Sequence, residues 1–377
     1  MSITVSATPV TIVGAGPAGL AAAIALARAG RAVVVREWHG TVGHRFHDDF
    51  QGLENWSDPR DVLDELWGFG IAADFDAHAV REGTVFDPAG TAHRVRSARP
   101  LYYAIRRGSS QGTLDASLRD QARRAGAEIR FGDRVQHLDG PGVLAGGPRV
   151  AGAIAVGYVF ETDMEDGDWL ALGNRLAPLG YAYLLVHGGR GTLATCLFSE
   201  FKRQAEYLQR TLAFFQDKTG LVMREPHPLG GFVNVRLPRH ATQGGHPVIG
   251  EQAGFQDALA GFGLRYALRS GVLVGRSLLE GVSYETLWRR ELRPQLRAGI
   301  VNRLLLNTLG EHGARMAIDR LAGGDAGTVL RRFYQPGRLS RLLFPLARWR
   351  YRRPLRDPSC DHHDCHCVWC ACQAEHA

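Results

Sequence analysis

The hydrophobic and polar positions of the first forty residues predict a strand, a helix and a second strand in close succession. Val10–Val13 is a short apolar run, residues 20–29 carry small and apolar side chains at helical spacing, and residues 32–35 form a second apolar run. Short buried strands separated by a helix-length segment are typical of a βαβ unit with parallel strands. We therefore expect such a unit over residues 1 to about 40.

Periodicity and turn residues divide the rest of the chain into further predicted elements. We expect a helix beginning around Ser57–Leu63 with a Ser or Asp cap, strands within 79–106, a helix over 110–125, a strand over 128–131 and extended chain over 134–138. Alternating apolar residues then predict strands within 151–198, a helix over 201–219, a strand over 230–237 and helices over 286–330.

The predicted fold class is α/β, with one Rossmann-like domain and one sheet-based domain inserted into it. We expect residues 1–150 and 246–285 to form the Rossmann-like domain and residues 151–245 to form the sheet-based domain, which would cover the first and receive the substrate. Residues 286–345 would be a C-terminal helical region, and residues 346–377 a basic tail rich in Cys and His.

Three glycines follow the first predicted strand, and an acid ends the second. Gly14 permits a tight turn, Gly16 lets the backbone approach a pyrophosphate, and Gly19 allows the helix to pack closely on the sheet. The helix N-terminus would direct free N–H groups at the phosphates. Glu37 stands where a carboxylate accepts hydrogen bonds from a ribose diol, and it would repel a 2′-phosphate. This order of elements predicts a dinucleotide site but does not choose between FAD and NAD.

Composition narrows the class of protein further. The chain has 377 residues, a hydrophobic content of 45% and a net charge of +7. We expect no nucleic-acid binding, because a genome rich in GC explains the predominance of Arg over Lys. Met1–Val13 shows neither a basic start nor a cleavage site, and no apolar stretch approaches a membrane span, so we expect a cytoplasmic protein.

The basic charge is concentrated near the C-terminus. Nine arginines fall between Arg331 and Arg356, interleaved with aromatic and aliphatic residues. Two interpretations remain open: a helix that packs on the domain with a solvated Arg face, and a segment that lies on an anionic membrane surface.

A second segment, residues 247–271, decides the cofactor. A predicted strand runs into Gly250-Glu251, then into Gly261-Phe262-Gly263-Leu264 at the start of a helix. The pattern resembles the Gly-Asp-Ala-Ala-Gly and Gly-x-Gly-Ile segment with which flavoprotein hydroxylases and geranylgeranyl reductases hold FAD. The resemblance implies that the acid holds the ribityl chain and that the helix N-terminus faces the flavin. Glu251 replaces the usual Asp, so its geometry must differ slightly.

Other stretches resemble the geranylgeranyl reductase branch of this group. Residues 178–183 are similar to its Pro-x-Gly-Tyr-x-Trp stretch, although Tyr183 replaces the Trp. Arg107 with Leu114-Asp115 and Leu118 resembles its Arg–Phe-Asp–Leu stretch, and residues 146–148 stand where that family returns toward the flavin. The resemblance spans residues 9 to about 285. Together with the glycine pattern it implies the following FAD contacts: Gly14, Gly16, Pro17, Ala18, Gly19, Glu37, Arg45, Arg107, Val135, Gly250, Glu251, Gly261, Phe262, Gly263 and Leu264.

The activity implied is hydride transfer from reduced flavin to an alkene of an isoprenoid or similar apolar substrate. Candidate proton donors are Tyr181, His44 and His47, with solvent as an equal alternative. Two other functions stay open: an FAD monooxygenase that hydroxylates an aromatic, and an electron-transfer flavoprotein. No second glycine-rich βαβ pattern appears for NAD(P)H, so the reductant would be NAD(P)H bound transiently or a ferredoxin-like carrier protein.

The C-terminal tail carries candidate metal ligands. Five of the six cysteines lie in residues 360–372, with histidines between them. This density of thiolates and imidazoles suits zinc or copper, and an iron–sulfur cluster or a tail without metal are the alternatives. The candidate ligands are Cys360, Cys365, Cys367, Cys370, Cys372 and His362.

Overall fold

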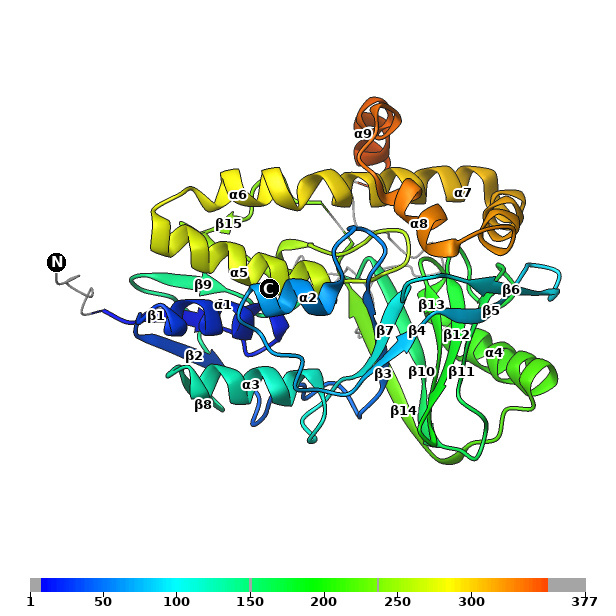
Figure 1. The fold of residues 1–377 in the computed structure, drawn as a ribbon, viewed down its shortest axis with the longest axis horizontal. Coiled ribbons are helices and arrows are strands. Elements are labelled where there is room, and N and C mark those ends of the chain that lie inside the picture. Colours follow the sequence, from blue (N-terminus) through cyan, green and yellow to red (C-terminus); the bar gives the residue numbers. More distant parts are fainter. Residues whose placement is uncertain (1–7, 149–150, 236, 352–377) are drawn as a thin grey trace.

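The computed structural model describes residues 8–148, 151–235 and 237–351 of the chain. Two sheets stand side by side in Figure 1, a parallel sheet under helices on one side and a larger mixed sheet on the other. The predicted α/β class with a Rossmann-like domain, a sheet-based domain and C-terminal helices is confirmed.

The parallel sheet is built from the predicted βαβ unit and two later strands. Its order is β8-β2-β1-β9, and every pairing is parallel. Parallel strands need crossover connections, and α1 joins β1 to β2 as expected. The elements are β1 (Val10–Val13), α1 (Pro17–Arg28), β2 (Val33–Glu37), α3 (Leu114–Arg124), β8 (Glu128–Phe131) and β9 (Gly142–Leu144).

Helix α5 (Leu264–Glu280) packs tightly against α1 because both helices present small residues. A Cβ on Gly271 would collide with the Ala18 carbonyl, and one on Gly275 would lie 2.8 Å from the Ala25 Cβ. The main apolar core fills the space between these helices and the strands, and it includes the fully buried Trp288. Helix α5, which begins only at Leu264, is thereby fixed against the first helix of the chain.

The second sheet has seven strands in the order β14-β10-β13-β12-β11-β5-β6, antiparallel except for β11 with β5. Helix α4 covers it, and Phe215 of α4 is fully buried there. The elements are β5 (Glu82–Phe86), β6 (Ala92–Arg96), β10 (Ala153–Glu161), β11 (Gly167–Leu172), β12 (Tyr181–His187), β13 (Arg190–Leu197), the 3-10 turn η1 (Phe201–Arg203), α4 (Gln204–Thr219) and β14 (Arg224–Val233).

Strands β5 and β6 correct the expected domain boundary. Residues 82–96 were expected within the Rossmann-like domain, yet they extend the seven-stranded sheet beside β11. Alternation along the chain predicts that a strand exists, but the partner strand is non-local and leaves no mark in the pattern. The remaining strands of that stretch form a three-stranded sheet, β3 (Phe50–Glu54), β7 (Tyr102–Arg106) and β4 (Ala77–Val80), between the two larger sheets.

Helix α2 (Val62–Gly68) begins within the expected range, and Asp61 is its cap and accepts a hydrogen bond from the Leu63 amide. Two smaller expectations are corrected. No strand is assigned over residues 134–138. Residues 346–350 belong to the last helix and not to the tail.

The C-terminal region is helical, as expected, and crosses the top of the molecule in Figure 1. Helix α9 stands out from the body there. No helix of the described residues is long and apolar enough to cross a membrane. The elements are β15 (Thr242–Gln243), β16 (His246–Pro247), the 3-10 turn η2 (Gly250–Ala253), α6 (Tyr284–Glu291), α7 (Arg293–Ala322), which has a non-helical residue at Gly310, α8 (Ala326–Tyr334) and α9 (Arg338–Arg350).

Candidate functional site

The turn after β1 is shaped by two glycines that cannot carry a side chain. Gly14 has a φ of +108°, and a Cβ there would collide with the Ala145 carbonyl just after β9. A Cβ on Gly19 would collide with the Gly14 carbonyl. The strand, the turn and the first turn of α1 therefore approach one another as closely as backbone allows, in the roles that the sequence predicts.

Gly16 differs from these two, because a Cβ there would meet no protein atom within 4 Å. It is the N-cap of α1, and no side chain caps the first amides of that helix. Pro17 follows at the first helical position and Ala18 is buried behind it. The open space at Gly16 and the uncapped N–H groups together form a place for an anion such as a pyrophosphate.

Glu37 lies at the mouth of this turn. Its Oε2 accepts a hydrogen bond from the Ala15 amide (2.7 Å), and its Oε1 accepts one from the His39 amide (2.9 Å). Neighbouring Arg36 is directed away from Glu37 by its two hydrogen bonds to Asp133. Each Glu37 oxygen keeps a second lone pair, so the carboxylate can still accept from a ribose diol.

The second predicted segment reaches the same turn from the other side. Gln252 Oε1 accepts a hydrogen bond from the Gly146 amide (2.7 Å), next to the residue that Gly14 contacts. Glu251 Oε2 accepts one from Arg45 (2.9 Å), as part of an ion pair. Gly250 has a φ of +61°, and its amide donates to the Ser270 hydroxyl of α5.

Two buried polar atoms in this segment lack a partner among the described residues. They are Glu251 Oε1 and Gln252 Nε2, one acceptor and one donor on adjacent side chains. Buried polar groups are nearly always hydrogen-bonded, so this pair indicates a polar ligand between η2 and the glycine turn. The donors and acceptors fit the ribityl and pyrophosphate groups of FAD.

The start of α5 faces the seven-stranded sheet. Gly261 has a φ of +75°, and Gly263 caps α5 without any side-chain hydrogen bond. Phe262 packs edge-on against Trp56, with ring centroids 4.7 Å apart, and Leu264 is buried. The Tyr181 hydroxyl of β12 donates to the Ala260 carbonyl just before Gly261, which ties the sheet to this helix start.

Comparison with known proteins identifies part of this arrangement. Residues 7–146 match a family model described as an FAD binding domain. The match and the geometry of the glycine turn support an FAD-binding domain in this part of the chain. A search of curated proteins found no match.

The fold of the whole chain is similar to that of several solved flavoproteins. A geranylgeranyl bacteriochlorophyll reductase-like protein from Thermoplasma acidophilum is 18% identical with a TM-score of 0.70, covering 90% of this chain and 98% of that one. A p-nitrophenol 4-monooxygenase from Pseudomonas putida DLL-E4 is 15% identical (TM-score 0.59, 86% and 96% covered). A flavin-dependent brominase is 14% identical (TM-score 0.59, 91% and 98% covered). These likenesses confirm the fold of the suspected group, and with the family model they support an FAD-dependent oxidoreductase.

Arg107 is buried behind the FAD-binding domain's predicted cofactor space. Its guanidinium forms two hydrogen bonds with Asp115 (2.8 and 2.9 Å) and one with Gln51 (2.8 Å), and it lies 4.2 Å from the Phe46 ring centroid. Burial, the largest single influence, lowers the pKa of Arg107, but the carboxylates of Asp115, Asp49 and Glu251 together outweigh burial and the pKa is raised. These bonds use one hydrogen each of its Nε, Nη1 and Nη2 atoms. The predicted contact of Arg107 with the cofactor stays a prediction. Val135, also predicted, is half-buried in chain without regular structure.

The structure separates the two predicted catalytic residues. His44 is exposed and stacks on His39 (centroids 4.3 Å apart), whose amide binds Glu37. His44 therefore lies beside the acid expected to hold the adenosine ribose, and His47 is exposed on the same loop. Tyr181, in contrast, lies at the start of α5, where the resemblance places the flavin, and burial raises its pKa well above the usual value.

Sequence reasoning missed a buried acid near Tyr183. Asp49 is 4% exposed, accepts hydrogen bonds from the His47 amide (3.0 Å) and Gln51 Nε2 (3.2 Å), and burial raises its pKa. It also missed a polar chain in which Asp168 accepts from the Tyr102 hydroxyl (2.7 Å) and contacts His187 Nε2 (3.3 Å). Asp49 directly precedes a strand, a position that could have distinguished it from an ordinary loop acid.

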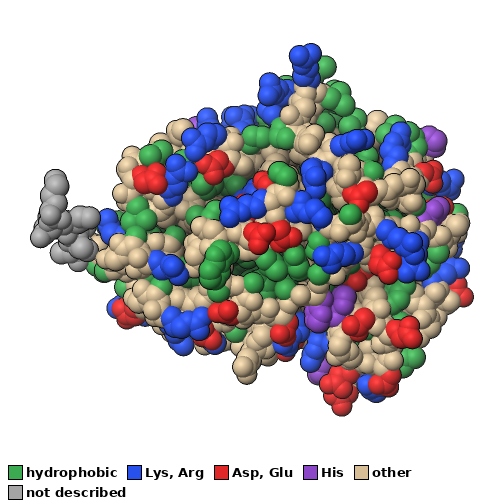
Figure 2. Space-filling model, in the orientation of Figure 1, with side chains coloured by type: hydrophobic (Ala, Val, Ile, Leu, Met, Phe, Trp, Pro, Cys, Tyr) green, Lys and Arg blue, Asp and Glu red, His purple; other side chains and the backbone are tan. Residues whose placement is uncertain are grey.

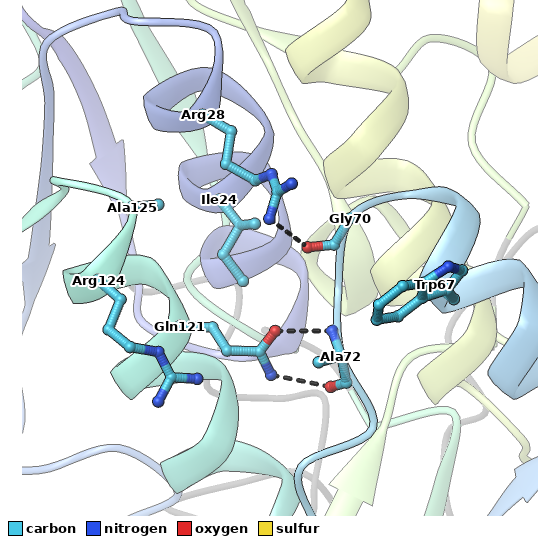
Figure 3. A pocket seen from close by; sticks show the side chains of 8 residues that line it. All are labelled: Ile24, Arg28, Trp67, Gly70, Ala72, Gln121, Arg124 and Ala125. Atoms are coloured by element: carbon cyan, nitrogen blue, oxygen red, sulfur yellow. Dashed lines mark hydrogen bonds between the residues drawn. The ribbon is translucent and has the colours of Figure 1, made fainter.

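A separate groove of about 540 Å³ lies on the outside of the FAD-binding domain, between α1, α3 and the loop after α2 (Figure 3). Gln121 bridges to the backbone of Ala72 there, and Arg28 donates to the Gly70 carbonyl. None of its lining residues is a predicted cofactor contact. The candidate metal ligands Cys360 to Cys372 lie outside the described residues.

Proposed function

We propose that this protein reduces carbon–carbon double bonds of an isoprenoid or similarly apolar substrate. Bound FAD, once reduced, would supply the hydride. The observation that carries the proposal is the junction at Ala260, where β12 and the start of α5 meet through the Tyr181 hydroxyl. Aromatic side chains crowd this junction, with Tyr181 and Tyr183 6.3 Å apart and Phe262 6.0 Å from Tyr102. An apolar substrate suits such surroundings.

The solved structure with a TM-score of 0.70 supports the proposal of a reductase. It carries the description of a geranylgeranyl bacteriochlorophyll reductase-like protein, and it covers nearly the whole chain at 18% identity. Fold alone does not assign a substrate, so the proposal depends on the aromatic junction and on the resemblance of residues 178–183.

The second carbon of the alkene needs a proton, and Asp49 is our proposed source. Burial raises the pKa of Asp49 and so favours the protonated carboxyl, and Asp49 is near enough to Tyr183 for its charge to add to burial in raising the pKa of that phenol. Tyr181 would then position the substrate at the start of α5. A buried acid with a raised pKa beside aromatic side chains can hold the proton that the second carbon needs.

An anaerobic turnover experiment tests the proposal. The purified protein is photoreduced without oxygen and mixed with a set of prenyl alcohols and prenyl diphosphates, and the products are analysed by mass spectrometry. We expect at least one alkene to gain two hydrogen atoms while the flavin absorbance returns. If no alkene in the set is reduced and the flavin stays reduced, the proposal is wrong.

Aromatic hydroxylation is the second candidate, because a p-nitrophenol 4-monooxygenase shares the fold at a TM-score of 0.59. The two reactions differ in what the product gains. A hydroxylase needs oxygen and adds one oxygen atom to an aromatic, whereas a reductase works under anaerobic conditions and adds hydrogen only. Turnover of phenols in labelled oxygen, with the label in the product, would favour the second candidate.

The electron donor and the tail remain proposals as well. We propose NAD(P)H or an acidic ferredoxin-like carrier as the donor, since the chain carries a net charge of +7. We also propose zinc, copper or an iron–sulfur cluster at the cysteines of residues 360–372. Metal analysis of the protein with and without residues 358–377 tests the tail. Equal metal content in both proteins would contradict a metal site in the tail. Turnover that survives the deletion would contradict an electron-transfer role for the tail.

A further inference from the structure

Helix α9 has two unlike faces. One face packs on α7 through Leu343, Phe344 and the fully buried Ala347. The other presents large apolar side chains to solvent at helical spacing: Leu339 (58% exposed), Leu342 (77%), Leu346 (53%) and Trp349 (61%). Their spacing of three, four and three residues places all four on one side of the helix.

Arginines flank this exposed apolar face in the sequence. Between residues 331 and 350 there are six Arg and neither Asp nor Glu, and four of the six lie on α9 itself: Arg338, Arg341, Arg348 and Arg350. Figure 2 shows blue and green side chains together on the projection that α9 forms at the top of the molecule. An isolated exposed leucine needs no explanation, but an apolar stripe bordered by cations indicates a surface that is both apolar and anionic.

A cationic pocket lies at the base of the same helix. Its volume is about 340 Å³, and it is lined by residues from the loop before β15, from α6 and α7, and from α9: Leu237, Pro238, Arg239, His240, Arg289, Arg293, Phe344 and Arg348. Glu285 faces this cluster and pairs with Arg289 (2.6 Å) and His240 (3.3 Å).

The pocket carries a net positive charge, because the single carboxylate of Glu285 faces the guanidinium groups of Arg239, Arg289, Arg293 and Arg348. Arg289 Nε is buried without a hydrogen-bond partner among the described residues. Burial and the nearby charges of Arg239 and Arg293 lower the pKa of Arg348. A phosphate group would accept hydrogen bonds from these guanidiniums in the bidentate geometry that Arg favours.

We propose that α9 and this pocket form a docking site for an anionic phospholipid membrane. The stripe Leu339–Trp349 enters the apolar boundary of the bilayer, and the pocket of Arg239, Arg293 and Arg348 takes a lipid headgroup phosphate. Charge complementarity selects anionic lipid over other apolar partners, because Arg338 and Arg350 flank the stripe along α9 and residues 331–350 contain six arginines and no acid. The proposal does not depend on the reaction proposed above.

Vesicle flotation with the full-length, FAD-containing protein tests this site. We expect binding to phosphatidylglycerol vesicles, little binding to phosphatidylcholine vesicles, and a loss of binding when salt rises from about 0.05 to about 0.5 M. The double variant Leu342→Glu/Leu346→Glu should bind about tenfold more weakly or worse, because both side chains are exposed and their exchange leaves the fold intact.

Matched variants distinguish membrane binding at this surface from nonspecific adsorption of exposed apolar residues and from binding of inorganic phosphate. Trp67→Glu removes an equally exposed apolar residue on α2 (75% exposed) and should bind vesicles like the wild type. Arg239→Ala/Arg348→Ala should weaken binding to the anionic vesicles several-fold. Absence of vesicle binding by the wild type, with or without binding of inorganic phosphate, would overturn the proposal, as would unchanged binding of Leu342→Glu/Leu346→Glu. A chain ending at Tyr351 should still bind, and failure of that chain alone would assign the lipid contact to residues 352–377.

Discussion

The cofactor turn after β1 and the junction around Tyr181 are determined in different ways. The turn is defined by absent side chains, since Gly14 and Gly19 leave room only for backbone. The junction is defined by the side chains that are present, namely Tyr181, Tyr183, Phe262 and Asp49. A backbone cradle recognises a group common to many cofactors, whereas a set of side chains selects one substrate. The first is therefore readable from a short motif, and the second is not.

The strongest test of this contrast compares two glycines of one turn. Gly14→Ala puts a Cβ into the Ala145 carbonyl at a φ of +108°, so we expect the free energy of unfolding to fall by about 5 kcal/mol. Gly16→Ala meets no protein atom and should cost about 1 kcal/mol or less in the FAD-free protein, while FAD affinity falls at least about tenfold. Urea denaturation and FAD titration measure both. A Gly16→Ala protein with normal FAD affinity would show that no phosphate lies there.

The second prediction concerns the contribution of the buried ion pair Arg107–Asp115 to the stability of the FAD-binding domain. Both side chains are at most 5% exposed, so Arg107→Met leaves a buried carboxylate and should cost about 3–4 kcal/mol. Adding Asp115→Leu should recover much of that loss. Arg130→Ala, which breaks an exposed pair with Glu128, should leave stability unchanged in the same denaturation experiment. Equal effects of the two single variants would contradict the role given to burial.

The third prediction concerns Glu251 and its contribution to FAD affinity. Its Oε1 is buried without a partner among the described residues, and its Oε2 pairs with Arg45, whose side chain is 42% exposed, so Glu251→Ala should change the stability of the FAD-free protein by less than about 1 kcal/mol. FAD binding should weaken about tenfold, equivalent to about 1.4 kcal/mol, because the ligand loses a charged acceptor. Glu251→Asp should fall between the two. Fluorescence titration of FAD gives the affinities, and an unchanged value for Glu251→Ala would remove this residue from the site.

The smallest effect concerns Asp49 and depends on pH. Because burial raises its pKa in the folded state, the folded protein holds the proton more tightly than the unfolded chain. Its contribution to stability is complete below the ordinary carboxyl pKa and is lost as pH rises through the raised pKa. Asp49→Asn should therefore match the wild type near pH 4 and exceed it by about 1 kcal/mol near pH 8. A stability difference that does not change with pH would show that Asp49 is not held protonated.

The sequence predicted the parts of the molecule that local rules determine. The glycine turn, α1, β2 and Glu37 follow from spacing along forty residues, and Gly250–Leu264 was found because it repeats a family pattern. The placement of β5 beside β11 was missed, since strand pairing is set by packing between distant segments. Asp49 was missed for the same reason: the groups that bury it come from elsewhere in the chain.

His44 illustrates the limit most clearly. A histidine near a cofactor motif suggested chemistry, but its ring stacks on His39 beside Glu37, whereas Tyr181 lies at the start of α5. His44 was proposed from its residue type alone. Its position relative to the cofactor site becomes visible only in the folded structure. Tyr181 was proposed from a stretch of sequence, and its hydroxyl does lie at the start of α5. Its role in catalysis stays a prediction.

The most direct test of the account compares FAD with FMN, because the two differ only in the adenosine monophosphate that the glycine turn and Glu37 would hold. The protein is stripped of flavin and titrated with each under the same conditions. We expect one FAD per chain and FMN binding weaker by about a hundredfold or more. Equal affinity for FMN and FAD, or no bound flavin at all, would contradict the assignment of Gly14–Gly19 and Glu37 to the cofactor.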